Sequence, residues 1–565
     1  MTFRIDGGTW RPRLLAATLA LVGTLAGAGR PVGAADKNPG ERHLVLFYTA
    51  EVHGTVEPCG CTSDPLGDIS RLAPLIADAR RTGAGVALLD AGGLLYPEGS
   101  ISTKERASAD LRADFLAREF DHLGMLGAAL GETDLASGTS HVQPKRLASN
   151  ITGAPQSVRP PFVQKVGAVA VGVLGVADPV LAATLGGRAE DPTKAAQRDV
   201  AELRRQGAEV VVLLAPVDKN AARKLARETG VDVVVLGKRV GQGMARVERV
   251  GRAFIVASAD ELQRVGRLEI VLRGPASPGS PLELTDAGGP EADKLRREEI
   301  AHSLERLRTD LQSWSGAGGK SGGGADRSFV AAKKQEQADL LAEQEKLKAA
   351  WKAPATGSYV INALIPLRRS LKRDPAVVAR MKTLDKSIAA SNLKQATPPP
   401  AAEPGRATYV GMSKCATCHK AATTFWTHTI HAQAWKTLVD GGKQADYKCI
   451  GCHVTGFGQV GGSSLGFTKK LESVQCETCH GPGSLHVAGE GNEEPLAIKR
   501  QTPETVCLGC HTEQHSDTFQ YEAYLRDIVG PGHAPKLRQQ LGAGKTGHEL
   551  RATALARAKL AATAP

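Results

Sequence analysis

Short hydrophobic runs alternate with amphipathic segments over the first half of the chain. The hydrophobic runs have the length of buried strands and cover His43–Thr49, Val86–Asp90, Val169–Gly175, Val210–Ala215 and Val231–Leu236. The segments with a helical spacing of apolar residues are Lys104–His122, Asp191–Gly207 and Lys219–Thr229. Strands that alternate with helices predict an α/β domain, a sheet covered by helices, over residues 35–280.

The pattern changes to long polar helices after residue 280. Apolar residues recur three to five positions apart, close to a heptad seam, at Leu295, Ile300, Leu304, Leu307, Leu311 and Trp314. A loop at Ser315–Gly324 separates this seam from a second polar helix that ends near Trp351. We expect residues 281–395 to form an antiparallel helical hairpin with connecting helices, either a spacer or an arm for a homodimer. A stiff Pro-rich linker occupies residues 396–406.

The first 34 residues have the pattern of a secretory signal peptide. Arg4, Arg11 and Arg13 precede the apolar stretch Leu14–Ala28, and small residues at Val32–Ala34 offer a cleavage site. The apolar stretch is shorter than the roughly 20 residues that span a bilayer. We therefore expect an exported protein, periplasmic or on the cell surface, without an integral membrane span.

Length, composition and charge predict a globular protein of several domains. The 565 residues are too many for one core and predict two or three domains. Hydrophobic residues (42%) and charged residues (23%) are in the range of globular proteins. The net charge of +12 raises the question of nucleic-acid binding. We attribute it to solvated charged faces and expect no nucleic-acid partner.

Four copies of the pattern C-x-x-C-H follow the linker and contain eight of the ten cysteines. The cysteine pairs are Cys415 and Cys418, Cys449 and Cys452, Cys476 and Cys479, and Cys507 and Cys510; the histidines that follow them are His419, His453, His480 and His511. This spacing attaches c-type haem: the thiols form thioethers and the histidine binds the iron. Zinc ribbons lack the systematic histidine, and disulfide scaffolds lack so regular a repeat. We predict four covalent c-type haems in a mostly α domain at residues 407–535, in which the haems replace much of the core. A basic, Ala-rich tail follows at 536–565.

Other histidines in this half are candidates for the second axial position of each iron. They are His428, His431, His486, His515, His533 and His548. His428 and His431 lie three residues apart on an expected helix, so only one of them can face a given haem. We expect about half of the six to be ligands.

The stretches between the motifs resemble the cytochrome c-554 family over about Tyr409–His533. The resemblance rests on Tyr409–Cys415, on Trp426 with His431, on Cys452–Gly458 and on Val474–Gly483. It implies an electron-transfer module in which most haems have two histidine ligands. By position it implies that His486 pairs with His419, His533 with His480 and His431 with His511. The haem of His453 has no matched partner: either it is open or His515 closes it.

The α/β half resembles the secreted 5′-nucleotidase and calcineurin-like metallophosphatases over about His43–Leu272. The resemblance lies in the order of the segments Leu44–Gly54, Asp68–Arg80, Val86–Gly93, Gly131–Asp134, Ser149–Ile151 and Gly167–Ala177. Of the residues that hold two metals in that family, His53 alone stands unchanged; Gly93 replaces the bridging Asp, and Lys238 and Val240 replace the last two histidines. Because two close cations need an anion between them, we expect a catalytically silent phosphatase-like domain.

Cys59 and Cys61, beside His53 on the loop after the first strand, leave three interpretations open. They could form a strained, labile disulfide across one Gly. They could bind a soft metal or a substrate together with His53. They could also be an ordinary disulfide or two unreactive thiols.

The sequence as a whole predicts an exported tetrahaem cytochrome that passes electrons to and from a redox partner, with no catalytic residues of its own. The α/β domain would dock that partner or a small ligand. One alternative is an oxidoreductase that acts on a small nitrogen species at an open second haem. A less favoured alternative is a 5′-nucleotidase-type phosphoesterase.

Overall fold

The computed structural model describes residues 40–563 except 142–145, 154–157, 239, 275–281, 317–326, 349–350 and 492–496. The expected signal peptide lies outside these residues. The chain divides into two compact units, residues 1–37 with residue 565, and residues 38–564. Everything below concerns the second unit. Within the described residues, no helix has the length and apolar character needed to cross a membrane.

One sheet of eight strands is built around β1 (Arg42–Thr49). Its order is β15 (Leu284–Asp286), β16 (Ser358–Pro366), β14 (Arg264–Leu272), β1, β2 (Gly85–Asp90), β3 (Met125–Ala129), β4 (Arg146–Leu147) and β6 (Val158–Arg159). β1 runs parallel to β2 and antiparallel to β14, with Tyr48 opposite Gly266. β16 is antiparallel to β14.

A second sheet has six strands around β10 (Val210–Ala215). Its order is β12 (Glu248–Val250), β13 (Ala253–Val256), β11 (Val233–Leu236), β10, β8 (Val169–Gly175) and β7 (Phe162–Val166). β8, β10, β11 and β13 are parallel. A separate pair joins β5 (Ile151–Thr152) to β9 (Arg188–Ala189), near the short helix α3 (Leu181–Thr184).

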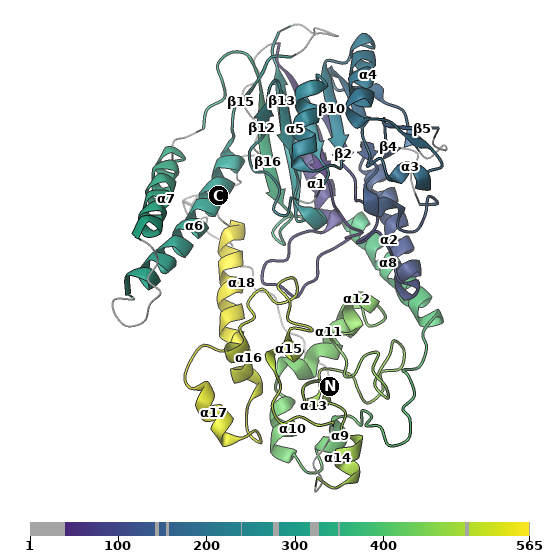
Figure 1. Ribbon diagram of the computed structural model, residues 1–565, viewed down its shortest axis with the longest axis vertical. Coiled ribbons are helices and arrows are strands. Elements are labelled where there is room, and N and C mark those ends of the chain that lie inside the picture. The colour runs from purple at the N-terminus through teal and green to yellow at the C-terminus, as the bar shows by residue number, and fades with distance from the viewer. Residues whose placement is uncertain are drawn as a thin grey trace, which may run out of the picture. The chain divides into compact units, whose positions relative to one another are not determined.

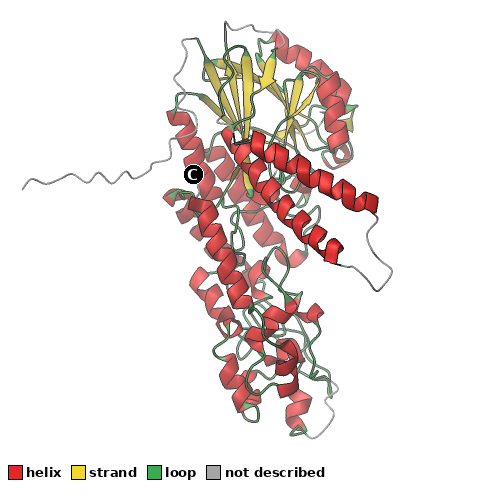
Figure 2. Cartoon of the chain, turned by 90° about the vertical axis from the view of Figure 1, so that its left-hand side faces the viewer, coloured by secondary structure: helices red, strands yellow, loops and turns green. Residues whose placement is uncertain are grey.

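The two sheets pack face to face between two layers of helices (Figures 1 and 2). On β1, Leu44, Leu46 and Tyr48 point into the core between the sheets. Val45 and Phe47 point to the opposite face, into a core shared with α1 (Leu72–Arg81), α2 (Thr103–His122) and α8 (Pro375–Lys394). A third core joins the second sheet to α4 (Pro192–Arg205) and α5 (Lys219–Glu228). Successive strand residues alternate between faces, so both faces of β1 must be apolar, which explains its continuous hydrophobic run.

The five predicted strands and three predicted helices of this region are present within one or two residues of their expected ends. The strands β15 and β16 are among the elements that the sequence analysis did not predict. Residues 281–395 were expected to form the hairpin and connecting helices; α8 is such a helix, packed against α2, whereas residues 358–366 form a strand of the first sheet. The pairing of β16 with β14 joins segments about 90 residues apart, and no local pattern encodes such a pairing.

The predicted helical hairpin consists of α6 (Pro290–Gly316) and α7 (Arg327–Lys346). Arg296 near the start of α6 donates two hydrogen bonds of 2.8 Å to Glu343 near the end of α7, so the helices are antiparallel. Ile300 and Leu307 of the expected seam are buried. The expected loop falls largely on residues 317–326, outside the described residues.

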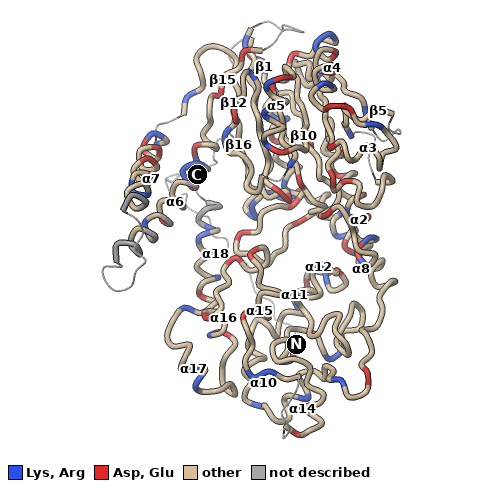
Figure 3. Tube along the Cα trace, viewed as in Figure 1, with Lys and Arg blue, Asp and Glu red and all other residues tan. Residues whose placement is uncertain are grey.

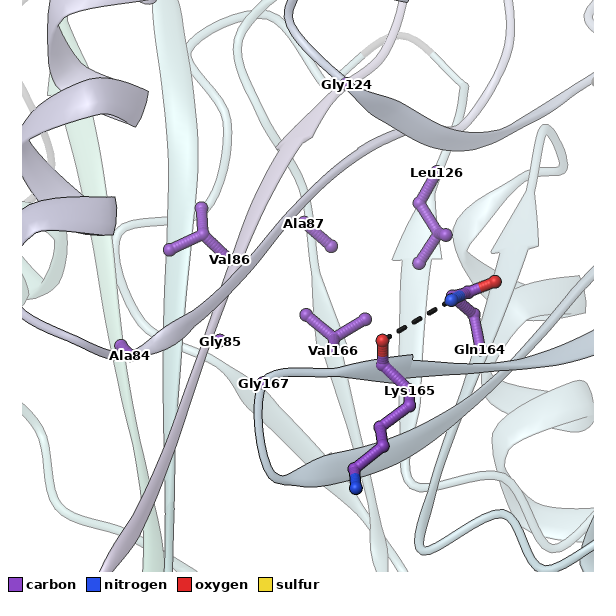
Figure 4. Close-up of a pocket in the computed structure, with 10 residues that line it drawn as sticks. All are labelled: Ala84, Gly85, Val86, Ala87, Gly124, Leu126, Gln164, Lys165, Val166 and Gly167. Carbon is purple, nitrogen blue, oxygen red and sulfur yellow. Dashed lines mark hydrogen bonds between the residues drawn. The ribbon is translucent and has the colours of Figure 1, made fainter.

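A hollow of about 380 Å³ lies where the two sheets approach each other closely (Figure 4). Its lining combines backbone with small and apolar side chains around Gly85 and Gly167. A Cβ on Gly85 would collide with the carbonyl of Val166, so the glycine is required by this close approach. Lys165 is the charged side chain at its edge. The hollow does not border the cysteine motifs.

The chain after the linker consists of short helices joined by turns. They are α9 (Met412–Cys415), α10 (Lys420–Trp426), η4 (Ile430–Gln433), α11 (Ala434–Gly441), α12 (Tyr447–Ile450), α13 (Cys476–His480), α14 (Ser484–Ala488), α15 (Glu504–Cys507), α16 (Tyr521–Ile528), α17 (Pro535–Leu541) and α18 (Gly547–Thr563). The buried apolar cluster of this region is small and centres on Ile450, Val454 and Leu465. Figure 3 shows basic and acidic residues interspersed along the chain.

Candidate haem-binding sites

Each C-x-x-C-H motif lies at or just after a short helix. α9, α12 and α15 each contain the first cysteine of a motif, and α13 contains a whole motif. The amide of His419 donates to the carbonyl of Cys415 (2.9 Å), and His511 does the same to Cys507 (2.8 Å). Residues i, i+3 and i+4 share one face of a helical turn. The turn therefore aims both thiols and the imidazole to one side, as covalent attachment of a porphyrin above an iron ligand requires.

The motifs are neighbours in space in an order that differs from their order in the chain. Cys415 in the first motif lies close enough to Cys476 in the third for the two thiols to interact electrostatically. Cys452 in the second motif interacts in the same way with Cys510 in the fourth. Cys479 and Cys507 place the third motif beside the fourth. The spatial order is thus first, third, fourth, second.

Two pairs of imidazole rings face each other across the motifs. The ring centres of His419 and His486 are 6.2 Å apart, and those of His431 and His511 are 6.1 Å apart. His533 lies close enough to His480 for the two rings to interact electrostatically. Two imidazoles that bind one metal ion through nitrogen at about 2 Å each have ring centres roughly 6 Å apart. The two measured separations therefore fit an iron between each pair of rings.

Hydrogen bonds at Nδ1 fix the tautomer of two motif histidines. His453 donates to the carbonyl of Ala434 (2.5 Å), and His480 donates to the carbonyl of Lys499 (2.6 Å). A carbonyl oxygen accepts only, so the proton is on Nδ1 and the lone pair of Nε2 is available for a metal. Such a second partner also orients the ring and raises its basicity as a ligand.

The ring of His431, a histidine outside the motifs, is half-buried beside His511. Burial and the neighbouring His511 together lower its pKa to about 4. The imidazole is therefore neutral at physiological pH and can act as a ligand without first losing a proton.

The expected helix that carries both His428 and His431 is not formed as predicted. α10 ends at Trp426, and His431 lies in the separate 3-10 turn η4. His428 is exposed, and its Nδ1 bonds the carbonyl of Thr424 one turn earlier. The helix ends because the Trp426 carbonyl accepts from both the amide and the hydroxyl of Thr429, which turns the chain.

The buried carboxylate of Glu477, inside the third motif, was missed by the sequence analysis. It is 2% exposed and accepts hydrogen bonds from the amides of Val410, Gly411 and Gly483. It thereby fixes the segment that leads into the first motif against the third motif. A charged residue inside a cofactor motif was the one signal that could have revealed this role.

Among the described residues, no ring contact joins His453 of the second motif to another histidine. The exposed His515 bonds the hydroxyl of Thr512 through Nδ1 (2.7 Å), and it interacts electrostatically with Cys452 and with Cys59 of the α/β region. His515 is thus near the second motif without being paired with His453.

At the positions where the sequence resemblance would place metal ligands, the residues of this chain contact each other. Glu51 forms an ion pair with His53 (Oε2 to Nε2, 3.0 Å). A Cβ on Gly93 would lie 2.5 Å from Oε1 of Glu51, so the Glu51 carboxylate fills the space that a bridging Asp at 93 would need. Within the described residues, no group of three or more His, Cys, Asp or Glu side chains could hold a bare metal ion.

Comparison with known proteins relates the motif region to one family. Residues 414–481 match the family model of cytochrome c554 and c-prime. Cytochrome c-554 of Nitrosomonas europaea is 40% identical over an alignment of 93 positions, and the match covers 14% of this chain and 40% of that protein. The chain thus spans less than half the length of this curated relative. The resemblance and the c-type haem chemistry predicted from the sequence are confirmed for this region.

Solved structures similar to the chain include three phosphoesterases. They are a 5′-nucleotidase precursor from Thermus thermophilus (21% identity, TM-score 0.35, 41% of this chain and 51% of that one), NAD nucleotidase from Haemophilus influenzae (14%, TM-score 0.35, 54% and 61%) and a calcineurin-like phosphoesterase from Bacillus subtilis (16%, TM-score 0.32, 42% and 87%).

Proposed function

We propose that this protein is an exported tetrahaem c-type cytochrome that transfers electrons to and from a redox partner. The observation that carries the proposal is the placement of His486 and His431, from outside the motifs, opposite the motif histidines His419 and His511. The four C-x-x-C-H motifs supply the attachment points. When bound, c-type haems supply one-electron chemistry whose potential depends on the axial ligands, burial and hydrogen bonds.

We assign each histidine a role from its position. His419, His453, His480 and His511 are the ligands supplied by the motifs. His486, His431 and His533 are the opposite ligands for the first, fourth and third irons. The carbonyls of Ala434 and Lys499 hold His453 and His480 with Nε2 free for the metal. The half-buried His431 is neutral at physiological pH and so can act as a ligand.

In this proposal the α/β region is a non-catalytic docking or ligand-binding domain. The support is that the side chain of Glu51 occupies the space of the bridging carboxylate and pairs with His53. A bridging anion is what a two-metal centre requires.

A second candidate function follows from the surroundings of His453. If no side chain closes that iron, the protein could act as an oxidoreductase on a small nitrogen species there. The supporting observation is that the nearby His515 is exposed and, among the described residues, makes no ring contact with His453. Carbon monoxide, added to the reduced holoprotein, separates the two functions. A change amounting to one haem of the four favours the second candidate, and no change favours the carrier.

The variant His431→Ala tests the proposal directly. The holoprotein should keep its c-type α-band, because the thioethers are intact, and one additional haem should bind carbon monoxide. The matched control is His428→Ala, three residues earlier, which should leave carbon monoxide binding unchanged because His428 is exposed. Absence of a c-type band from a host competent in haem attachment would refute the proposal. Equal carbon monoxide binding by the two variants would refute the role of His431.

A further inference from the structure

Cys59 and Cys61 are the two cysteines outside the haem motifs, and their side chains lie together. They are on the loop between β1 and η1 (Ile69–Arg71), separated by Gly60. Their Sγ atoms are 2.7 Å apart. Cys59 is exposed and Cys61 is partly exposed. The pair is therefore both close enough to react internally and accessible to reagents.

The loop that carries this pair is held against the region of the second and fourth motifs by three contacts. Lys443, six residues before the second motif, binds Glu57 (2.7 Å). Asp517, six residues after the fourth motif, accepts from the amide of Ser63 at 3.1 Å. The guanidinium of Arg551 on α18 donates to the carbonyl of Cys61. Anchors on both sides of the cysteines fix the loop at one place.

That place is beside the second motif. Cys61 interacts electrostatically with Cys449, and Cys59 interacts with Cys452 and Cys449. His515 also lies close enough to Cys59 to interact with it electrostatically. The α/β region thus brings two sulfur atoms to the second motif.

The chemistry of the pair suits oxidation. Hydrogen bonding with Cys61, together with a smaller effect of His515, lowers the pKa of Cys59 to about 6, so Cys59 is largely thiolate at neutral pH. The thiolate is the reactive form in disulfide chemistry.

We propose that Cys59 and Cys61 form a redox-active dithiol–disulfide pair that exchanges electrons with the haem attached at Cys449 and Cys452. This inference rests on the proposed function, because it needs the haem. On oxidation the Cys59 thiolate and the Cys61 thiol form one S–S bond, the S–H bond of Cys61 breaks and its proton passes to water. The two electrons leave one at a time and reduce two ferric c-type haems. Reduction of the disulfide reverses each step.

The proposal selects among the interpretations that the sequence left open. An inert structural disulfide would need neither exposure nor a position against a haem motif. In the structure His53 is paired with Glu51, which takes it away from the role of a third ligand to a soft metal. A small ring closed across one Gly also favours a reducible bond, since strained or exposed disulfides have the more oxidising potentials.

The test is a reductive titration of the anaerobic holoprotein together with trapping of the thiols. Wild type should take up two more electrons per chain than the double variant Cys59→Ser/Cys61→Ser, because the couple is a two-electron couple. Thr62→Ala on the same loop is the matched control and should take up as many electrons as wild type. Samples of wild type poised across the titration, alkylated and analysed by mass spectrometry, should gain two alkyl groups at Cys59 and Cys61 only at the reducing end.

Three results would overturn the inference. Equal electron uptake by wild type and the double variant would do so, as would alkylation that does not change with potential. A metal bound to the pair and released with its thiols would do so as well. The haem content of the protein is measured before each of these experiments. A missing haem counts against the proposed function. A full haem complement without the two extra electrons counts against this inference alone.

Discussion

Three charged side chains, Asp90, Asp134 and Arg146, are each 0% exposed in the α/β region. Asp90 accepts from the hydroxyl of Thr49 (2.6 Å) and from the amide of Gly92 (2.9 Å). Arg146 lies 3.8 Å from Asp134. Burial raises the pKa of Asp90 to about 7, although Arg146 acts in the opposite direction. A carboxyl group with so high a pKa titrates in the physiological range.

Titration of Asp90 should make the stability of the protein depend on pH. The folded state holds a proton that the unfolded state loses near its ordinary pKa of about 4, so the contribution is complete below that pH and is lost as the pH rises through about 7. The free energy of unfolding should therefore fall by up to about 4 kcal/mol across this range. Asp90→Asn should flatten the fall, measured by urea unfolding followed by circular dichroism at about pH 5 and about pH 8. The exposed Asp78→Asn is the control, and equal pH slopes in wild type and Asp90→Asn would contradict the expectation.

At the level of single residues, the sequence predicted the side chains that attach haem. It did not predict the side chains that hold these motifs in place. The spacing of Cys, Cys and His follows from covalent chemistry within five residues, so it can be read locally. The role of Glu477 depends on amides at Val410 and Gly411, more than sixty residues earlier. No local pattern encodes a carboxylate that satisfies so distant a segment.

Among the strands, the contact of β1 with β14 places a ring against a glycine. Tyr48 lies opposite Gly266, and a Cβ on Gly266 would collide with the ring of Tyr48. The hydroxyl of Tyr48 donates to Asn362 of β16 (2.8 Å). One side chain thus joins three neighbouring strands, and the absence of a Cβ at 266 makes room for it.

Gly266→Ala should destabilise the α/β region by about 1–3 kcal/mol, the usual cost of overpacking a dense core. The measurement is the midpoint of thermal unfolding followed by circular dichroism. Tyr48→Phe keeps the ring and should cost about 1 kcal/mol through the lost hydrogen bond. In a Tyr48→Leu background the effect of Gly266→Ala should shrink, because the two positions are coupled through contact. If the effects of Gly266→Ala and Tyr48→Leu on the midpoint were additive, the ring of Tyr48 would not be the group that the new Cβ displaces.

The elements themselves were predicted where burial leaves a local signature. β1, β8 and β10 are buried on both faces, and their continuous apolar runs made them visible. β16 is just as buried at Val360 and Ala363, yet it stands between polar helices and pairs with β14 far away in the chain. Hydrophobic pattern identifies such a segment as buried without saying against what, so its place in the sheet could not be predicted.

At the scale of the whole molecule, buried polar contacts join the α/β region to the haem-motif region. Arg112 of α2 donates to Asp446 (2.6 Å), and both side chains are about one-tenth exposed. Burial would raise the pKa of Asp446, but Arg112 outweighs it and holds that pKa below its ordinary value. Asn392 at the end of α8 donates to the carbonyl of Ala445 (2.9 Å). These contacts predict that the two regions unfold together.

Arg112→Met should make the α/β region and the haem-motif region unfold at different temperatures. It leaves the carboxylate of Asp446 without its cation, and breaking a pair this buried costs about 3–5 kcal/mol. In wild-type holoprotein, the thermal transition followed by the haem absorbance should coincide with that followed by far-ultraviolet circular dichroism. In the variant the two midpoints should differ. Lys436→Ala, which breaks the exposed pair with Asp440, is the control and should leave them together. Coincident transitions in Arg112→Met would show that this pair does not couple the regions.

The spatial order of the motifs has a consequence for synthesis of the chain. The first and second motifs leave the ribosome before their spatial neighbours, the third and fourth motifs, have been synthesised. Cys415 lies near Cys476, and Cys452 lies near Cys510, and both of these partners come later in the chain. A shortened product that stops after the third motif would keep the first and third together and leave the second without its neighbour. In the spatial order first, third, fourth, second, the fourth motif lies between two others. Its loss would therefore remove a motif from the interior of this order rather than from one end.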